Sequence, residues 1–371
     1  MHRVMIVINS LHSGGAEKTC IALARHLRQR CDVEVVSLII GGPAEQELRS
    51  LGIKVTVLEA RTFLQKLRSS LRLAQLMRAS KPDTVVTFLY IADLVAGALA
   101  RILLPRAKVF WNIRNNVLSR RQSGRATFVV ARVNALLSRF VPSAIVYCSA
   151  MSRSQHEALG FRNAVSAVVE NSAANVPFSF SPAKRNHFRG RRFEGEFLFL
   201  MVGRFDPVKR VDVYVDACVQ LHRQFGGAMR FVIAGRGMDV QNQSLMQRIE
   251  SSGIADRFVL LGHVEDQQEV YSAADCLVVT SESEGSPNAV YEALAVKLPV
   301  VIFATLGTES VVGETVVRLP HRDMDALVQA MRECVVKGAV RPAVRVTDDN
   351  GARPDAEHSI VGYYRRALPC G

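Results

Sequence analysis

Short apolar runs alternate along the chain with longer segments in which apolar residues recur at helical spacing. A first run at residues 3–9 precedes a helical pattern at 16–28. Strands that alternate with helices of this length predict parallel βαβ units and a doubly wound sheet. In the first half, strands are also predicted at 33–39, 54–58, 83–88, 108–112, 144–148 and 165–170, and a helix at 62–79.

The alternation stops at residues 173–196, where prolines, serines and a basic cluster predict an interdomain linker. It then returns, with a helix predicted at 211–225 and strands at 197–202, 229–234, 257–261, 276–280 and 299–303. We therefore predict an α/β chain of two doubly wound parallel-sheet domains, residues 1–172 and 197–354, followed by a last helix within 355–371. Open sheets of this kind bind ligands at the carboxyl ends of their strands, so a cleft between these edges is expected to hold the ligand.

The composition excludes several classes of protein. A chain that is 49% hydrophobic and 22% charged is typical of globular proteins. No uncharged apolar run approaches the ~18 residues of a spanning helix, and no signal-peptide pattern follows Met1. The seven cysteines are widely spread and form no CxxC pair, which predicts reduced thiols and no zinc site. A cytoplasmic location is expected.

The net charge of +13 is unevenly distributed along the chain. Residues 1–172 hold 24 Lys and Arg against 10 Asp and Glu, whereas residues 173–371 hold 23 against 24. Such an asymmetry predicts that the first half meets a polyanion or an anionic membrane. No helix-turn-helix, zinc-finger, RRM or KH pattern accompanies the charge, so nucleic acid is not expected as a partner.

The first candidate motif, Ser13-Gly14-Gly15-Ala16-Glu17, lies between the first predicted strand and helix. A glycine pair there allows a phosphate or sugar to approach the backbone, and a helix N-terminus offers unpaired N–H groups. The motif is not GxGxxG, and a plain tight turn is the alternative.

The second motif follows the first strand of the second domain and contains Gly203, Arg204 and Lys209. A guanidinium and an ammonium at the cleft edge suit a diphosphate. Two solvated surface cations are the alternative interpretation.

The third motif pairs two carboxylates, Glu284 in a predicted loop and Glu292 in the helix that follows. Both can face one pocket, where one would orient sugar hydroxyls and the other a ribose diol. An acid within an apolar helix is costly unless it has a partner. The alternative is an ordinary loop acid and an exposed helix acid.

The three motifs in this order, on two tandem α/β domains, resemble a retaining glycosyltransferase of family 4 (GT4) with the GT-B fold of two Rossmann-like domains. Supporting matches lie at residues 233–237, 261–264 and 274–275. The resemblance covers roughly residues 4–335 and is strongest in the second domain. It implies that the C-terminal helix returns towards the first domain.

The resemblance also implies roles for the motif residues. Arg204 and Lys209 would hold the donor diphosphate, Glu292 would bind the ribose, and Glu284 would contact the donor sugar near the reacting carbon. The other donor-binding residues that the family implies are Gly14, Gly15, Gly203, His263, Val264, Ser286, Pro287 and Asn288. Because two cations would stabilise the leaving diphosphate, no metal or other cofactor is expected.

The expected substrates are a nucleotide-diphosphate sugar and a lipid-linked or growing surface-glycan acceptor. A UDP-sugar, with UDP-HexNAc among the candidates, is preferred to a GDP-sugar. Many relatives carry a histidine in the loop where this chain has Arg114, which predicts that Arg114 contacts donor or acceptor phosphate. A surface arginine at the border of the core is the equally open alternative.

The predicted helix at 62–79 carries Lys66, Arg68 and Arg72 beside several leucines. A basic apolar helix can lie in the interface of an anionic leaflet. We therefore expect peripheral attachment to the inner face of the cytoplasmic membrane. In the alternative arrangement, the apolar stripe packs on the sheet and the basic face lies in water.

Two other functions remain open at this point. A non-hydrolysing epimerase or a phosphorylase could use the same double-sandwich plan, but their acid–histidine set or cofactor lysine is not found. A non-catalytic protein with a basic membrane- or polyanion-binding domain is the second alternative. It predicts that Arg204, Lys209 and Glu284 are dispensable.

Overall fold

The computed structural model describes residues 1–12, 14–60, 62–115, 125–173, 176–190, 192–284, 286–305, 307–308, 311, 313, 315–338 and 360–368. Ser13 of the first motif, Gly285 directly after Glu284 of the third motif, and the predicted boundary at residue 354 lie outside these residues. The chain divides into two compact units, Met1–Asn175 with Ala352–Gly371, and Val176–Gly351. Each unit is described by itself.

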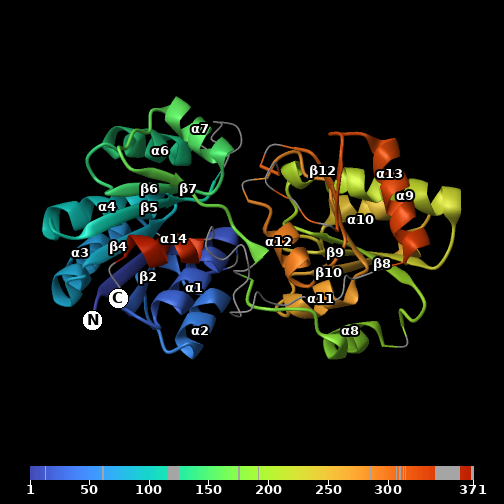
Figure 1. Cartoon of the computed structure of the whole chain (residues 1–371), viewed down its shortest axis with the longest axis horizontal. Coiled ribbons are helices and arrows are strands. Elements are labelled where there is room, and N and C mark those ends of the chain that lie inside the picture. Colours follow the sequence, from blue (N-terminus) through green and yellow to red (C-terminus); the bar gives the residue numbers. More distant parts are fainter. Residues whose placement is uncertain are drawn as a thin grey trace. The chain divides into compact units, whose positions relative to one another are not determined.

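The first unit is a parallel sheet of seven strands, in the order β3-β2-β1-β4-β5-β6-β7, with helices on both faces (Figure 1). Its strands are β1 (Arg3–Ser10), β2 (Asp32–Ile40), β3 (Lys54–Val57), β4 (Thr84–Phe88), β5 (Lys108–Ile113), β6 (Ala144–Tyr147) and β7 (Ser166–Val168). Its helices are α1 (Gly15–Leu27), α2 (Pro43–Ser50), α3 (Phe63–Ser80), α4 (Tyr90–Leu103), α6 (Arg125–Leu137), α7 (Ala150–Leu159) and α14 (Ile360–Ala367).

Successive side chains of the central strand β1 enter two different cores. Ile6 packs in the core that α1, α2 and α14 cover, whereas Met5 and Val7 pack in the core beneath α3, α4 and α6. This follows from the two-residue period of a strand, which directs alternate side chains to opposite faces. A strand buried on both faces has an almost continuous apolar sequence, as residues 3–9 do.

The second unit is a parallel sheet of six strands, in the order β10-β9-β8-β11-β12-β13. Its strands are β8 (Phe197–Val202), β9 (Met229–Ala234), β10 (Phe258–Gly262), β11 (Cys276–Val279), β12 (Val300–Phe303) and β13 (Val316–Leu319). Its helices are α8 (Pro182–Arg189), α9 (Val211–Phe225), α10 (Gln243–Glu250), α11 (Gln267–Ala273), α12 (Asn288–Ala295) and α13 (Met324–Lys337), with short 3-10 turns at Pro207–Lys209 and Ala255–Arg257. The two parallel sheets confirm the predicted α/β class of two doubly wound domains.

The segment predicted to be a linker at 173–196 is largely structured. Ser181 caps α8 by accepting a hydrogen bond from the Lys184 N–H, and Pro182 occupies the first helical position. Arg185 and Arg189 both pair with Asp275, which precedes β11 and is buried. This segment therefore belongs to the second unit from Val176 onward.

Helix α14 packs within the first unit, where Ile360, Tyr364 and Leu368 join the core beside α1. The Asn112 amide of β5 donates to the Tyr364 hydroxyl at 2.8 Å. This places the end of the described chain on the first unit's sheet, as drawn in Figure 1.

The cysteines of the described chain are mostly free thiols, with one exception. Free thiols are found at Cys20, Cys148, Cys218, Cys276 and Cys334 among the described residues, whereas Cys31 is disulfide-bonded. The expectation of thiols throughout is therefore wrong at Cys31, which is buried in the core that α14 completes. Cysteine spacing along the sequence does not show which cysteines the fold brings close enough to form a disulfide.

No helix in the described ranges is long and apolar enough to cross a membrane.

Candidate functional site

The carboxyl ends of β8 and β9 approach each other closely, and this approach requires glycine. Gly235 has φ +137°, and a Cβ there would lie 1.8 Å from the Gly203 carbonyl oxygen. The Gly203 N–H donates to Ala234 O at 2.9 Å, and the Lys209 stem passes 3.4 Å from the position of a Cβ at Gly203. The Lys209 stem therefore occupies the space beside Gly203 that the side chain of a larger residue would need.

Lys209 pairs with Glu284, which follows the neighbouring strand β11. The ammonium donates to both carboxylate oxygens, at 2.7 and 2.9 Å. The Glu284 side chain is only 9% exposed, against 24% for Lys209. A nearly buried carboxylate needs such a partner, since burying an unpaired charge is costly.

Arg204 lies in the same connection and is two-thirds exposed. Its Nε donates to Asp206 Oδ2 at 2.9 Å. Burial of Asp206 opposes ionisation, but the Val208 N–H and the Arg204 guanidinium outweigh it and lower the pKa of Asp206. Asp206 thus anchors the arginine, a role that the sequence analysis did not assign.

Glu292 has a different partner from Glu284. It is buried in α12 and accepts a hydrogen bond from the Tyr271 hydroxyl of α11 at 2.7 Å. Burial and the neighbouring Glu292 charge raise the pKa of Tyr271 well above its usual value, so this hydroxyl remains a donor. Sequence reasoning missed Tyr271 because an apolar helical position gives no sign that its hydroxyl turns towards an acid.

The N-terminus of α12 contains three further predicted residues. Pro287 is the N-cap, and the Asn288 N–H donates to Ser286 O at 2.8 Å. The Ser286 hydroxyl is buried and, within the part of the chain that the structure describes, has no hydrogen-bond partner. A helix N-terminus beside an unsatisfied hydroxyl is suited to an anion.

His263 and Val264 lie in the turn after β10. His263 is exposed, and Val264 packs partly against the core of β8 and α11. The preceding Gly262 accepts a hydrogen bond from the Gly235 N–H at 2.6 Å. The second unit therefore brings the loops of Gly203, Gly235 and Gly262 together at one edge of its sheet.

The first unit holds Gly14 and Gly15 at the start of α1. Gly14 is the N-cap, and Glu17 in the first turn accepts a hydrogen bond from Ser10 at the end of β1, at 2.9 Å. A Cβ at Gly14 would lie 2.5 Å from a Glu17 carboxylate oxygen. The glycine therefore allows Glu17 to fold back over the helix start.

Arg114 follows β5, and its guanidinium is covered by protein. Nη1 donates to Val169 O at 3.0 Å, whereas Nε and Nη2 are buried and have no hydrogen-bond partner among the described residues. Burial lowers the pKa of Arg114, although the Cys148 thiol and the Tyr364 hydroxyl oppose this shift. The side chain is thus a border residue of the core with unused donors.

Helix α3 both packs on the sheet and presents apolar side chains to solvent. Leu73 and Met77 are buried, whereas Leu64, Leu67 and Leu71 are 56%, 56% and 61% exposed. The predicted cations Lys66, Arg68 and Arg72 are exposed on the same helix. The alternative in which the whole stripe packs on the sheet is therefore correct only for part of the helix.

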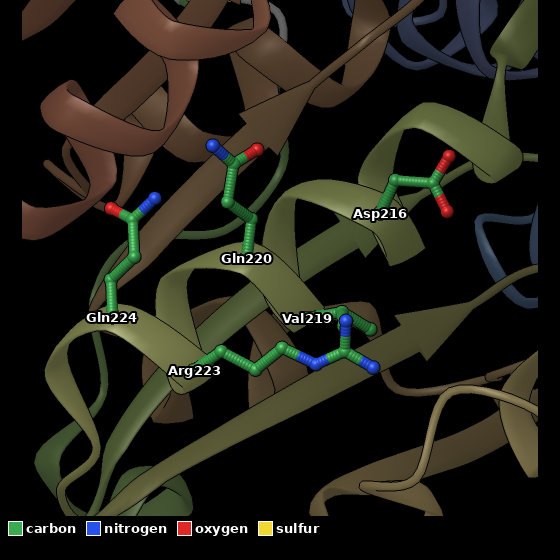
Figure 2. Close-up of a pocket in the computed structure, with 5 residues that line it drawn as sticks. All are labelled: Asp216, Val219, Gln220, Arg223 and Gln224. Carbon is green, nitrogen blue, oxygen red and sulfur yellow. The ribbon is translucent and has the colours of Figure 1, made fainter.

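A shallow pocket of about 450 Å³ that is open to solvent lies along α9 of the second unit (Figure 2). Its lining contains none of the predicted site residues and consists of Asp216, Val219, Gln220, Arg223 and Gln224. Within the described part of the chain, no three His, Cys, Asp or Glu side chains are grouped so that they could hold a metal ion.

Two families of known proteins match this chain. The family described as glycosyl transferase 4-like domain matches residues 14–172, and the family described as glycosyl transferases group 1 matches residues 196–336. Each match falls within one of the two units. Between them they include every predicted donor-binding residue.

Relatives of this chain among characterised proteins are also named as glycosyltransferases. The GalNAc-alpha-(1->4)-GalNAc-alpha-(1->3)-diNAcBac-PP-undecaprenol alpha-1,4-N-acetyl-D-galactosaminyltransferase of Campylobacter jejuni is 27% identical over 306 residues, which are 79% of this chain and 77% of the relative. The D-inositol 3-phosphate glycosyltransferase of Saccharomonospora viridis is 30% identical over 185 residues, which are 45% of this chain and 42% of the relative.

Solved structures share the fold. Anabaena Alr3699/HepE in complex with UDP-glucose has a TM-score of 0.76 at 19% identity, over 91% of this chain and 90% of that one. Sucrose-phosphate synthase of Thermosynechococcus elongatus has a TM-score of 0.68 at 16% identity, over 91% and 90%. The epimerase-like and non-catalytic alternatives are not favoured, and the chain belongs to the family 4 glycosyltransferases of the GT-B fold and is a hexosyltransferase.

Proposed function

We propose that this glycosyltransferase moves a sugar from a nucleotide-diphosphate sugar to a lipid-linked or growing surface glycan, with retention of configuration and without a metal. The observation that carries the proposal is the Lys209–Glu284 pair at the ends of two neighbouring parallel strands. Arg204 lies in the same loop as Lys209, and the unsatisfied Ser286 hydroxyl lies two residues after Glu284. These groups offer positive charge and hydrogen-bond donors to a diphosphate.

Lys209 is suited to a leaving diphosphate. An ammonium has three N–H donors, and Glu284 accepts two of them, so that one remains for a phosphate oxygen. Arg204 can add a forked contact, since its guanidinium is exposed. Fixed cations that stabilise charge on a leaving group are a large catalytic contribution, so the proposal requires no metal.

In the proposed retaining reaction, the acceptor attacks from the side that the diphosphate leaves. The departing phosphate takes the acceptor proton, while Lys209 and Arg204 stabilise the developing charge. Glu284 would contact the donor sugar near the reacting carbon, and Glu292, fixed by Tyr271, would bind the ribose. His263 and Val264 would meet the base, and Gly14 and Gly15 would approach the donor from the first unit.

The preferred donor is a UDP-sugar, with a UDP-N-acetylhexosamine as the leading candidate. The Campylobacter jejuni relative is named as an N-acetylgalactosaminyltransferase, and the Anabaena structure contains UDP-glucose. The relative's name also gives a PP-undecaprenol-linked acceptor, which supports a lipid-diphosphate acceptor here. With such an acceptor, the protein would take part in the synthesis of a surface polysaccharide or glycan.

A thermal-shift panel tests the donor site. UDP, UDP-glucose, UDP-N-acetylglucosamine, UDP-N-acetylgalactosamine and GDP-mannose are compared in the presence of EDTA. A ligand at 100 times its Kd stabilises the folded protein by about 2.7 kcal/mol. We expect the UDP compounds to raise the melting temperature, and Glu292→Ala to abolish the shift while the exposed-helix control Glu333→Ala keeps it. A panel without any shift would refute the donor site; a shift by GDP-mannose alone would refute the UDP preference.

Arg114 is the proposed contact for an acceptor phosphate. A buried guanidinium with two unused donors is costly unless an anion completes its hydrogen bonds. Its position after β5 puts it at the carboxyl edge of the first unit's sheet, where such sheets bind ligands.

The basic, apolar face of α3 is the proposed route to a membrane-held acceptor. Leu64, Leu67 and Leu71 are exposed beside the three cations. Apolar side chains among cations suit the interface of an anionic leaflet, where each cation contributes about 1 kcal/mol.

Liposome sedimentation tests this attachment to the cytoplasmic leaflet. We expect binding to vesicles with phosphatidylglycerol but not to neutral phosphatidylcholine vesicles, and a loss of binding for Arg68→Glu/Arg72→Glu. The matched control is Arg332→Glu/Lys337→Glu, which changes the same number of charges on α13 of the second unit. Equal loss in both double variants would mean that net charge alone drives binding. Negligible binding to both vesicles would overturn the peripheral attachment.

A further inference from the structure

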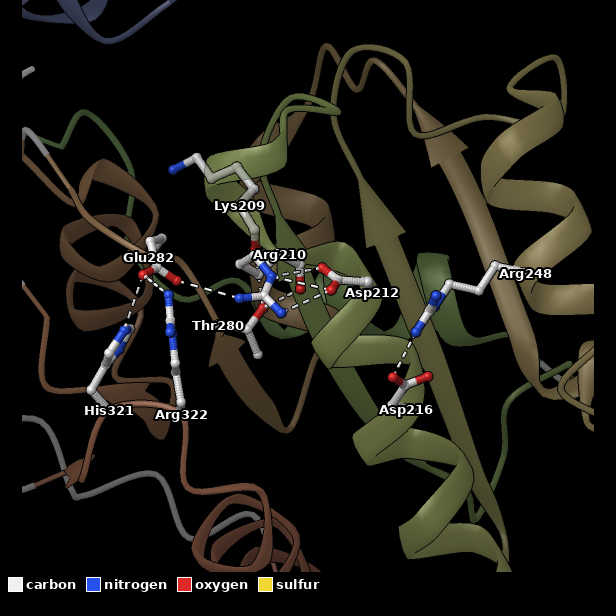
Figure 3. A network of polar contacts seen from close by, with 9 residues as sticks. All are labelled: Lys209, Arg210, Asp212, Asp216, Arg248, Thr280, Glu282, His321 and Arg322. Atoms are coloured by element: carbon white, nitrogen blue, oxygen red, sulfur yellow. Dashed lines mark hydrogen bonds and ion pairs between the residues drawn. The ribbon is translucent and has the colours of Figure 1, made fainter. Parts of the chain in front are cut away.

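Three of the described non-glycine residues of the second unit have left-handed backbones, and two of them, Arg210 and Arg322, direct their guanidinium groups at one carboxylate. Arg210 has φ 49° and Arg322 has φ 63°. Arg210 Nη1 donates to Glu282 Oε2 at 3.3 Å, and Arg322 Nη2 donates to the other oxygen, Oε1. Figure 3 shows Glu282 between them. Left-handed backbone is disfavoured for L-residues with a side chain and persists only where its surroundings hold it.

Further contacts extend this arrangement at both ends. Arg210 donates from Nε and Nη2 to the Asp212 carboxylate, at 2.9 to 3.1 Å, in the first turn of α9. His321 Nε2 lies 3.3 Å from Glu282 Oε1. We call Arg210, Asp212, Glu282, His321 and Arg322 the Glu282 cluster. It connects the segments that follow β8, β11 and β13, because its members come from these three connections (Figure 3).

The Glu282 cluster is continuous in sequence with the Lys209–Glu284 pair. Arg210 follows Lys209 directly, and Glu282 precedes Glu284 by two residues. The two loops are also joined through their backbones, since the Glu282 N–H donates to Val208 O at 2.8 Å. Thr280 Oγ1 lies 3.1 and 3.0 Å from the carbonyl oxygens of Lys209 and Arg210. A shift of either loop would therefore move Lys209 relative to Glu284.

We propose that Glu282 and Arg210 are positioning residues, which hold Lys209 and Glu284 in their reactive arrangement by fixing the two loops that carry them. This inference rests on the proposed role of Lys209 at the leaving diphosphate. Glycine would adopt the left-handed turn at residue 210 without strain, whereas arginine adopts it at a cost that the ion pairs of its guanidinium with two carboxylates can offset. The ion pairs of Arg210 thus stabilise its left-handed backbone, and through this backbone they fix the position of the adjacent Lys209 ammonium.

The test compares Glu282→Gln with Glu333→Gln. Both remove one carboxylate charge from the second unit, but Glu333 pairs with Lys337 on the exposed face of α13. The assay is release of UDP from the nucleotide sugar that gives the largest thermal shift in the panel above. Because misplacement of a reacting group by about 1 Å can cost about 100-fold in rate, we expect Glu282→Gln to lower kcat at least tenfold. KM and the melting temperature should change little, and Glu333→Gln should match the unmodified enzyme.

Two substitutions of Arg210 separate position from folding. Arg210→Gly relieves the backbone strain and removes the guanidinium, so its melting temperature should be unchanged or higher while kcat falls as in Glu282→Gln. Arg210→Lys keeps a cation and should recover part of kcat. The double variant Arg210→Gly/Glu282→Gln should lose no more than either single variant, since both remove the same connection.

The outcomes distinguish this inference from the proposed function. If Lys209→Met keeps full activity, the leaving-group role fails and the inference fails with it. If Lys209→Met is inactive but Glu282→Gln and Glu333→Gln have equal kcat, only the positioning role is overturned. If Glu282→Gln and Arg210→Gly lose activity in proportion to a fall in melting temperature, the cluster is structural and the positioning role is likewise overturned.

Discussion

The Lys209–Glu284 pair allows stability and activity to be separated by substitution. Replacing Lys209 by Met keeps the length of the side chain but leaves a carboxylate that is 9% exposed without its cation. Breaking a buried pair in this way costs about 3 kcal/mol or more of folding free energy. Glu284→Gln should cost less, about 1 kcal/mol, because Lys209 is 24% exposed and its ammonium can turn to water. The double variant Lys209→Met/Glu284→Gln should regain most of the stability, since no buried charge remains.

Activity should not follow stability in this series. If Lys209 contacts the leaving diphosphate, Lys209→Met and the double variant should both lose on the order of 100-fold or more in kcat. Urea unfolding followed by far-UV circular dichroism measures the free energies, and UDP release measures turnover. Trp111, the chain's single tryptophan, lies in the first unit and reports that unit's transition separately as a control. Recovery of activity in the double variant, or a larger destabilisation by Glu284→Gln than by Lys209→Met, would refute the reasoning.

Two further predictions address other parts of the structure. Burial lowers the pKa of His156 to about 4, so between about pH 4 and 6.5 the unfolded chain binds a proton that the folded chain does not. The first unit should therefore lose up to about 3 kcal/mol of stability as the pH falls through this range. Urea titrations followed by Trp111 fluorescence should show this dependence of the unfolding free energy on pH, and an equal dependence in His156→Gln would contradict it. Gly235→Ala should destabilise the second unit by about 3 kcal/mol, because its Cβ would meet Gly203 O. Gly253→Ala, also at positive φ (+79°) but with open space around it, is the matched control in the same melting assay, and equal effects of both would exclude the steric argument.

The alternation of strands and helices could be predicted because it depends on local periodicity. Residues 3–9 and 197–202 are apolar enough to be buried on both faces, and the structure has them as central strands. Helix α8 could not be predicted in the same way. None of its residues is fully buried, and its tertiary contacts include the ion pairs of Arg185 and Arg189 with Asp275, about ninety residues further along the chain. Local periodicity carries no information about such a tertiary pair.

In the candidate site, too, some features could be predicted from the sequence and others could not. The placement of Lys209 and Glu284 at one edge of the sheet could be predicted because both follow parallel strands, whose carboxyl ends meet there, but the ion pair between them was not predicted. The Tyr271 partner of Glu292 and the covered guanidinium of Arg114 could not, since side-chain direction depends on packing that a motif does not record. The Glu282 cluster was also missed, because an arginine in a left-handed turn has no signature in the sequence.

Two anionic partners are proposed for the basic first unit, a membrane leaflet at α3 and an acceptor phosphate at Arg114. Their binding should depend differently on salt concentration. In residues 1–172, basic residues outnumber acidic ones by 24 to 10, so most of these cations have no carboxylate of their own half to pair with, whereas residues 173–371 are balanced at 23 to 24. The cations of α3 are exposed, and their attraction to a leaflet is screened beyond about 8 Å at physiological ionic strength. The Arg114 guanidinium is covered, so a phosphate bound there would be screened much less. Loss of vesicle binding in salt, with retention of acceptor binding, would therefore separate the membrane surface from the phosphate contact.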